Sequence, residues 1–275
     1  MKITTLVENS ITTGLAPLMG EHGLSFFIDT GDRKILFDTG KGLTLLSNAD
    51  ALGINLETID TVVLSHGHYD HAGGLKYLIK RNNDLTVIAH PGIFDNKLVL
   101  RDNKYHSIGI PDDKKILADS GIKIKLEKGP VTIDRRIIST GEIPMETDFE
   151  EIEPIFFSGK SGSEVPDTII DDRSLILDTK KGLVVIFGCA HRGVINTLKY
   201  ATKLTGIKNV HAILGGIHLM SADQAKLKKI FRCLKDYHIE KMILGHCTGF
   251  YTTAGFVNEF GNKIIPNTVG HVIEF

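Results

Sequence analysis

The chain has 275 residues, of which 42% are hydrophobic and 24% are charged, enough for one large domain or two small ones with a buried core. Its formal net charge of −1 gives no reason to expect nucleic acid as a partner, because phosphates attract strongly basic surfaces. The three cysteines cannot build a disulfide framework, and no apolar run approaches the roughly 18 residues of a membrane span. We therefore expect a soluble cytoplasmic protein, and the sequence leaves homo-oligomerisation open.

The first ninety residues predict strands with tight turns, followed by alternating helix and strand. Residues 30–33 suit a hairpin turn, and Gly53 stands where a helix C-terminus would end. The short, continuous apolar run at 61–64 is typical of a strand buried on both faces. In this part we predict strands at 2–8, 24–29, 34–37, 61–64 and 85–89, and helices at 43–53 and 75–79.

Residues 92–165 are the least regular part of the sequence. They contain four prolines and a Gly- and Ser-rich stretch at 158–163. Because regular patterning resumes directly afterwards, we expect an irregular insertion of loops and short strands within a single domain that spans residues 1–275. Long insertions of this kind are often binding loops or lids.

The last third of the chain again predicts a hairpin followed by helix–strand alternation. Ser221 and Gln224 have the spacing of a capping box at the start of a helix. We predict strands at 175–177, 183–187, 210–214, 241–244 and 269–275, and helices at 194–201 and 227–234. Both halves place strands before helix–strand alternation, which suits an α/β fold of two sheets packed face to face with helices outside.

Four potential metal ligands lie within six residues, directly after the apolar run at 61–64: His66, His68, Asp70 and His71. In a turn, His66 and His68 can point the same way and hold one ion, while the other two reach a second ion. Imidazole and carboxylate ligands suit zinc, iron or manganese. The competing explanation is a surface turn that is rich in histidine by chance. The spacing after a buried strand favours the metal site.

Two later histidines stand in comparable positions. His191 follows the strand predicted at 183–187, and His246 follows the one predicted at 241–244. The ends of strands are where α/β sheets present functional groups. Alone, neither histidine would be a strong candidate, but the earlier cluster makes both of them candidate ligands.

The pattern His66-x-His68-x-Asp70-His71 resembles the signature of the metallo-β-lactamase superfamily, and the likeness extends over essentially the whole chain. Asp38-Thr39-Gly40 is similar to the superfamily's earlier Asp-x-Gly element, whose aspartate supports the ligand loop. The resemblance implies a four-layer αββα fold with two mixed β-sheets packed face to face. It also implies a site for two divalent metal ions, with zinc expected and manganese or iron as alternatives. The implied ligands are His66, His68 and His191 for the first ion, and Asp70, His71 and His246 for the second.

One position departs from the superfamily pattern. A bridging aspartate usually follows the strand that corresponds to 210–214, but this chain reads Gly215-Gly216-Ile217-His218-Leu219 there. Three roles are open for His218: it takes the place of the bridging ligand, it binds one ion only, or it contacts the substrate.

The segments 188–196, 215–219 and 246–249 resemble a narrower subgroup, named after a dihydropterin–ribofuranosylaminobenzene 5′-phosphate synthase of methanopterin biosynthesis. Many members of this subgroup are known only as metal-dependent hydrolases. The resemblance implies a metal-dependent hydrolase in which a metal-bound hydroxide attacks a small, anionic ester or phosphoester. Two catalytic roles follow: Asp70 would orient the water and accept its proton, and His218 would protonate the leaving group.

Three alternatives compete with the hydrolase. The first is the synthase, which would join a dihydropterin to an aminobenzene ribotide 5′-phosphate. The second is a di-iron oxidoreductase, but that subgroup normally carries glutamate where this chain has His68. The third is a noncatalytic binding module, whose ligands should be eroded, whereas only one position departs here.

A few other residues are weaker candidates. Arg192 is either a contact for an anionic substrate or a solvated arginine at a helix start. Glu8 and Asn9 end the first predicted strand and could line a pocket. Cys189 and Cys247 are next to ligands, and we expect them to be small apolar filler.

Overall fold

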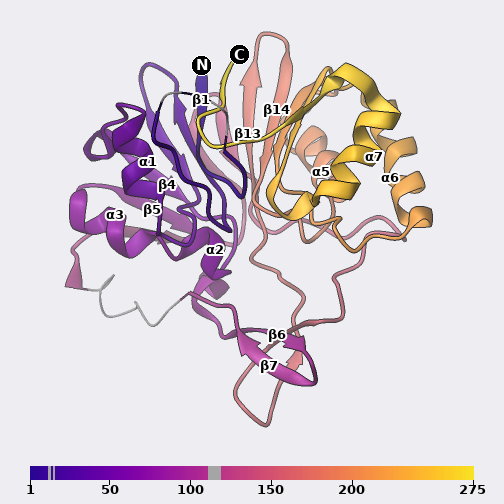
Figure 1. The fold of residues 1–275 in the computed structure, drawn as a ribbon, viewed down its shortest axis with the longest axis horizontal. Coiled ribbons are helices and arrows are strands. Elements are labelled where there is room, and N and C mark those ends of the chain that lie inside the picture. Colours follow the sequence, from indigo (N-terminus) through magenta and orange to yellow (C-terminus); the bar gives the residue numbers. More distant parts are fainter. Residues whose placement is uncertain (12–13, 15, 111–118) are drawn as a thin grey trace.

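The computed structural model describes residues 1–11, 14, 16–110 and 119–275 and shows two mixed β-sheets packed face to face. The helices lie on the outer faces of the sheets (Figure 1). On the first sheet these are α1 (Leu45–Ala51) and α3 (Leu75–Arg81), and on the second α5 (Val194–Thr205), α6 (Gln224–Asp236) and α7 (Phe250–Phe260). This arrangement confirms the predicted four-layer αββα fold.

Each sheet is antiparallel on one side and parallel on the other. The first sheet has the order β18 (Val272–Glu274), β1 (Lys2–Val7), β2 (Ser25–Asp29), β3 (Lys34–Phe37), β4 (Thr61–Val63), β5 (Thr86–Ala89) and β8 (Lys123–Leu126). The second has the order β17 (Ile264–Pro266), β16 (Lys241–Leu244), β15 (Val210–Gly215), β14 (Gly182–Phe187), β13 (Ser174–Thr179), β10 (Ile137–Ser139) and β9 (Val131–Asp134). Both predicted hairpins, β2–β3 and β13–β14, are confirmed.

The strands are apolar on both faces because each sheet is covered on both faces. In β2, Phe26 points into the core between the sheets, whereas its neighbour Phe27 packs with the apolar side chains of α1 and α3. In β4, Val63 faces the inner core and Val62 the outer one. This alternation explains the continuous apolar run at 61–64, since period-2 side chains enter a core on either side.

The segment 92–165 contributes strands to both main sheets, namely β8, β9 and β10. It also carries most of a third, small sheet with the order β12 (Val165–Pro166), β11 (Phe156–Ser158), β6 (Lys97–Arg101) and β7 (Lys104–Ser107). This part of the chain is therefore more regular than its prolines and glycines indicated. Residues 111–118 lie outside the described residues, and the single domain spanning residues 1–275 stays a prediction.

Short helices complete the chain. They are α2 (Tyr69–Ala72) and the 3-10 turns η1 (Leu56–Thr58), η2 (Pro91–Phe94), η3 (His246–Thr248) and η4 (Gly261–Lys263). Gly53, which we expected after α1, has a φ of 67°, a left-handed conformation that favours glycine. Among the described residues, no helix is both long and apolar enough to cross a membrane.

The start of α6 differs from the predicted capping box. Asp223 is the N-cap residue, and its side chain accepts a hydrogen bond of 2.7 Å from the backbone N–H of Lys226. Ser221, the predicted cap, donates its hydroxyl to Glu153 instead. The prediction was wrong because an aspartate two residues further on satisfies the free N–H of the first turn equally well.

We expect Asp223→Ala to lower the free energy of unfolding by about 1 kcal/mol, because it removes the only side-chain cap described for α6. Ser221→Ala should leave the helix cap intact and cost less. Urea denaturation of both variants measures the difference. An equal loss in the two variants would contradict this assignment of the cap.

Candidate metal centre

The predicted ligands and their predicted support, Asp38, lie in loops that follow parallel strands of both sheets. Asp38 follows β3, His66 follows β4, His191 follows β14 and His246 follows β16. These strand ends meet at one end of the sandwich, the end at which α2 lies, opposite the two chain termini (Figure 1). The inner core is closed by ligand loops at this end, so residues that are far apart in sequence become neighbours.

The backbone at this end adopts conformations that side-chain-bearing residues rarely adopt. Asp38, Ala190, His218 and His246 have φ values of 61°, 49°, 43° and 52°. Each such residue costs roughly 1–3 kcal/mol, and such residues gather at functional sites when the surrounding structure holds them there. The positive φ values turn the chain sharply after each strand and aim the side chains toward one another.

His66, His68 and His191 form the first group. His66 Nε2 lies 2.9 Å from His68 Nδ1, and the ring centroid of His191 lies 4.8 Å and 4.9 Å from those of His66 and His68. His191 Nε2 is buried and has no hydrogen-bond partner among the described residues. An orphaned, buried imidazole nitrogen is costly in the protein alone and offers a lone pair to a cation. The group therefore fits a divalent metal ion.

Asp70, His71 and His246 form the second group. The Nε2 atoms of His71 and His246 lie 3.1 Å apart, and Asp70 Oδ2 lies 3.8 Å and 3.4 Å from them. The centroids of the His66 and His71 rings are only 4.3 Å apart, so the two groups are adjacent. The six side chains named by the motif and the later histidines thus converge in two neighbouring groups of three.

His22 also contacts the second group, although the sequence did not identify it as a candidate site residue. Its Nε2 lies 3.2 Å from Asp70 Oδ2, and its ring stacks on His246 with centroids 5.2 Å apart. The side chain is 56% exposed, so it stands between this group and solvent. His22 lies in the loop before β2, where no ligand motif or strand end distinguishes it.

Asp38 holds the ligand loop by three hydrogen bonds. Its carboxylate accepts the backbone N–H and the hydroxyl of Ser65, each at 2.7 Å, and the Nδ1–H of His71, also at 2.7 Å. Ser65 Oγ in turn lies 2.8 Å from His66 Nδ1. Because these contacts occupy the Nδ1 atoms, His66 and His71 present Nε2 to the centre. This geometry is what the Asp-x-Gly element predicted for Asp38.

The loop of His246 is supported from β1 and the residues after it. Glu8 accepts the backbone N–H of His246, and Asn9 Oδ1 lies 3.0 Å from His246 Nδ1. Glu8 and Asn9 also line a cavity of about 560 Å³ next to His246, as the sequence suggested. Arg192, by contrast, donates its guanidinium to the backbone carbonyls of Ile143 and Thr168, so it has a structural role.

Charge is distributed unequally between the two groups. Burial and neighbouring histidines lower the pKa of His66 and of His191, so both rings are neutral, the form that binds metals. Burial opposes a charge on His71, but Asp38 and Asp70 raise its pKa to about 9. Burial likewise opposes ionisation of Asp70, yet the adjacent His71 and His246 hold the pKa of its carboxyl below its usual range. A metal ion bound by the second group would displace the proton of His71, because only the neutral imidazole binds metals.

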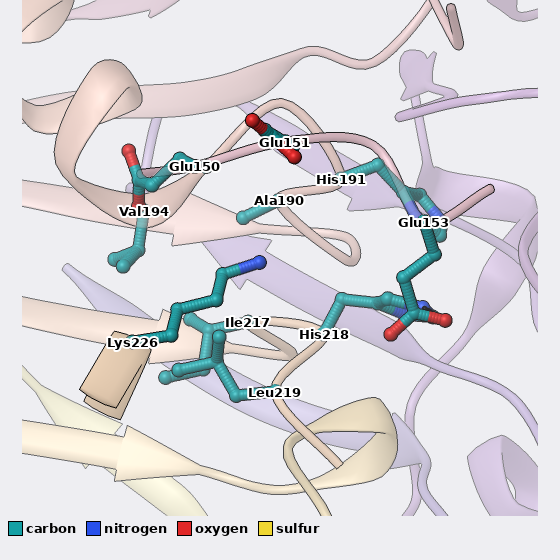
Figure 2. A pocket seen from close by; sticks show the side chains of 11 residues that line it. Glu150, Glu151, Glu153, Ala190, His191, Val194, Ile217, His218, Leu219 and Lys226 are labelled. Atoms are coloured by element: carbon teal, nitrogen blue, oxygen red, sulfur yellow. Dashed lines mark ion pairs between the residues drawn. The ribbon is translucent and has the colours of Figure 1, made fainter. Parts of the chain in front are cut away.

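His218 lies beside the first group, with a different set of partners. Its ring centroid is 4.2 Å from that of His191, and its Nε2 lies 3.6 Å from Glu153 Oε2. Figure 2 shows the side chains of His218 and Glu153 directed toward one another at the edge of a small pocket. Burial acts to lower the pKa of His218, but Cys247 and Glu153 raise it to about 10.

Cys189, which we expected to be apolar filler, lies within the centre. Its Sγ is 3.0 Å from His71 Nε2. Its sulfur also lies within 4.8 Å of ring nitrogens of two histidine pairs, His66 with His191 and His71 with His246. Cys247 lies beside His218, whose backbone N–H approaches the Cys247 sulfur at 3.3 Å. The signal that could have identified Cys189 is its place two residues before His191, in the same loop after a buried strand.

The small third sheet forms one wall of the centre. Phe156, in β11, packs its ring 5.4 Å from His68 and 5.1 Å from His191, measured between centroids. In β6, the Nζ of Lys97 lies 2.6 Å from Asp171 Oδ1. The other carboxylate oxygen, Asp171 Oδ2, accepts the backbone N–H of Gly67 at 2.8 Å. The segment 92–165 therefore packs against the first group through Phe156, and its Lys97 holds the carboxylate of Asp171 that binds the ligand loop.

Comparison with known proteins agrees with this geometry. Residues 18–246 match the Metallo-beta-lactamase superfamily. The chain belongs to the metallo-β-lactamase superfamily. Members of this superfamily usually bind divalent metal ions, and the clustered His, Asp and Cys side chains described above are the ligand types such ions take.

Three proteins are similar to this superfamily member over nearly its whole length. A 7,8-dihydropterin-6-methyl-4-(β-D-ribofuranosyl)-aminobenzene-5′-phosphate synthase of Methanocaldococcus jannaschii is 32% identical over 286 residues, covering 100% of this chain and 97% of its own. An uncharacterized protein of the same organism, MJ0448, is 38% identical over 90% of this chain and 91% of its own. Among solved structures, Tm1679, a metal-dependent hydrolase of the β-lactamase superfamily, has a TM-score of 0.85 and 30% identity and covers 100% of this chain and 99% of its own.

Proposed function

We propose that this protein is a metal-dependent hydrolase that acts on a small, anionic ester or phosphoester. It would hold two divalent metal ions, preferably zinc, with manganese or iron as alternatives. The observation that carries this proposal is the convergence of six potential ligands in two adjacent groups, with ring nitrogens 2.9 Å and 3.1 Å apart. The first ion would be held by His66, His68 and His191, and the second by Asp70, His71 and His246.

Divalent cations in this position would supply a Lewis acid and would lower the pKa of water to about 7. The protein's own part begins with Asp70. Its Oδ2 faces His22 and His246 at 3.2 Å and 3.4 Å, and the ionised carboxyl can orient a water molecule and accept its proton. Lys41 places a positive charge over the ring of Tyr69, the residue before Asp70, with its ammonium 5.2 Å from the ring centroid. A cation there favours an anionic substrate.

His218 would act as the proton donor to the leaving group rather than as a metal ligand. Its ion pair with Glu153 and its raised pKa keep the ring protonated at neutral pH. It also belongs to neither group of three described above, although it lies beside His191. A protonated imidazole at the edge of the centre is the arrangement that general acid catalysis requires.

We expect His218→Ala to lower kcat by about 10²- to 10⁴-fold while the metal content stays unchanged, because general acid–base catalysis contributes that much. His106→Ala, which alters an exposed histidine in β7, is the matched control and should behave as the unaltered protein does. Turnover and metal content are measured for both variants. Unchanged turnover in His218→Ala would remove its catalytic role, and loss of metal would make it a ligand.

The experiment that tests the proposal combines metal analysis with a substrate screen. Mass spectrometry of the purified protein should find close to two zinc or manganese ions per chain. A panel of carboxylic esters, phosphomonoesters and phosphodiesters should then include hydrolysed members, and chelation should abolish the activity. No bound metal after reconstitution would overturn the proposal. Two irons with oxygen reduction and no hydrolysis would favour the di-iron alternative.

A second candidate function is the joining of a dihydropterin to an aminobenzene ribotide 5′-phosphate, in which the new bond to the pterin's methyl carbon would displace a leaving group from that carbon. The relative that is 32% identical over the full chain carries the name of such a synthase. The cavity next to His246 also favours it, because at about 560 Å³ it has the size of a small-molecule site and is bordered by the apolar side chains of Met220, Phe250 and Val257. Flat aromatic rings suit such a lining. Incubation with both compounds, followed by mass spectrometry of the product, separates the synthase from the hydrolase.

A further inference from the structure

We propose that Cys189 is a thiolate ligand shared by the two metal ions, in the place where the superfamily usually has an aspartate. The proposal rests on the metal centre proposed above and adds a ligand to it. It also accounts for the departure at residues 215–219, where the bridging carboxylate is absent from the sequence. The bridging ligand is supplied from the neighbouring loop instead.

The position of the sulfur carries the argument. Cys189 Sγ lies 3.0 Å from His71 Nε2. With His66 and His191 it forms one set of potential ligand atoms, all within 4.8 Å of one another, and with His71 and His246 it forms another. Cys189 is the residue common to the two sets. One ligand atom that belongs to both groups lies where it can contact both ions.

The backbone conformation of residues 188–190 places the Cys189 sulfur in the centre. A Cβ atom at Gly188 would lie 2.1 Å from Ser65 Oγ and 3.1 Å from Asp38 Oδ2, so a glycine is required for the loop after β14 to approach the loop after β4 this closely. Ala190 then turns the chain with a φ of 49°. Cys189 and His191, on either side of that turn, both reach the centre, and Cys189 is only 3% exposed.

Coordination chemistry agrees with this position. Three side chains surround each proposed ion, and the shared sulfur would be a fourth protein ligand of each. The water of the proposed hydrolase would then be the fifth ligand, a coordination number that zinc can reach in catalytic sites. A thiol loses its proton when it coordinates such a cation, and the proton is released to solvent. Thiolate ligands favour zinc over manganese, so the shared sulfur also narrows the choice of metal.

The second buried cysteine does not share this geometry. Cys247 forms a possible ligand set with Cys189 and His218, but not with either pair of ligand histidines among the described residues. Its sulfur already accepts the backbone N–H of His218 at 3.3 Å. Cys233, in α6, lies outside all of these sets and serves as a control.

The test uses the full-length protein loaded with cobalt(II), which replaces zinc and reports thiolate ligands by a charge-transfer absorption in the near ultraviolet. We compare the unaltered protein with Cys189→Ser, Cys189→Ala, Cys247→Ser and Cys233→Ser. The charge-transfer band should be present in the unaltered protein and in Cys233→Ser and Cys247→Ser, and absent from both Cys189 variants. In both Cys189 variants, the affinity for the second equivalent of cobalt should also fall. Loss of a residue that only orients a ligand lowers metal affinity by about 10- to 100-fold, and loss of a ligand should lower it further.

Magnetic coupling distinguishes a shared sulfur from a ligand of one ion. At two equivalents, sulfur-bridged cobalt ions should couple, and the electron paramagnetic resonance signal per cobalt should be weaker than at one equivalent. A band that persists in the Cys189 variants, or two uncoupled ions, would overturn the proposal. If two ions bind with no thiolate band, the bridging sulfur is wrong and the metal centre stands; if no ion binds at all, both fail.

Discussion

Replacing His66 and His191 together with alanine is expected to remove the first metal ion and to reduce hydrolytic activity by more than about 100-fold. The two rings supply two of the three histidine ligands proposed for that ion. Only His68 and the shared Cys189 sulfur would remain, too few protein ligands to hold a divalent cation. Removal of a residue that only orients a ligand lowers activity by about 10- to 100-fold, and removal of two ligands should lower it further. The second ion should also bind more weakly, because the His66 ring lies 4.3 Å from that of His71.

Metal content by mass spectrometry and turnover on the best substrate of the screen are the two measurements. The matched control is His106→Ala/His238→Ala, which removes two exposed histidines and should change neither quantity. Circular dichroism confirms that both double variants are folded. Full metal content in the His66/His191 variant would show that the ions, if present, are held elsewhere.

Asp38→Ala is expected to have the largest effect on stability of any single substitution considered. The carboxylate is fully buried and accepts three hydrogen bonds, two from Ser65 and one from His71. Removing one partner of a buried ion pair costs about 3–5 kcal/mol, because the other partner is left without compensation. Metal affinity should fall by about 10- to 100-fold, since the rings of His66 and His71 lose the contacts that orient them.

Asp38→Asn separates the charge from the backbone conformation. Asparagine tolerates the positive φ of 61° found here, so this variant should keep the turn and lose mainly the ionic contact with His71. We expect it to fall between the alanine variant and the unaltered protein in both urea denaturation and metal affinity. Asp148→Ala, at an exposed aspartate, is the control. If Asp38→Ala binds metal as tightly as the control, Asp38 does not orient the ligands.

The strands, the fold and the ligand motif were predictable because they depend on local patterns. The apolar run at 61–64 indicated a strand covered on both faces, and β4 is buried on both faces. Four potential ligands within six residues sit on one loop, so their proximity follows from covalent connection. Asp38 was also assigned correctly as the support of that loop, through its resemblance to the Asp-x-Gly element.

Two features of the fold were not predicted correctly from the sequence: the strands of the segment 92–165 and the cap of α6. The segment 92–165 was expected to be irregular, because short strands in it, such as β8 and β11, pair with strands that are distant in the sequence and carry little pattern of their own. Strand propensity is weak information where the neighbouring strand decides. The cap of α6 was misassigned because two candidate residues, Ser221 and Asp223, lie two positions apart, and only the path of the chain decides which one reaches the free N–H.

By itself, the sequence determined the family, the α/β class and the residues from which a metal site would be built, because residue type and spacing along one loop decide those. Only the tertiary structure decided the partners of each side chain. It placed the sulfur of Cys189 between two groups of histidines, gave His218 a carboxylate partner in Glu153, and brought His22 to Asp70. Those contacts join loops from different strands, and their distances depend on how two whole sheets pack, which no local pattern encodes.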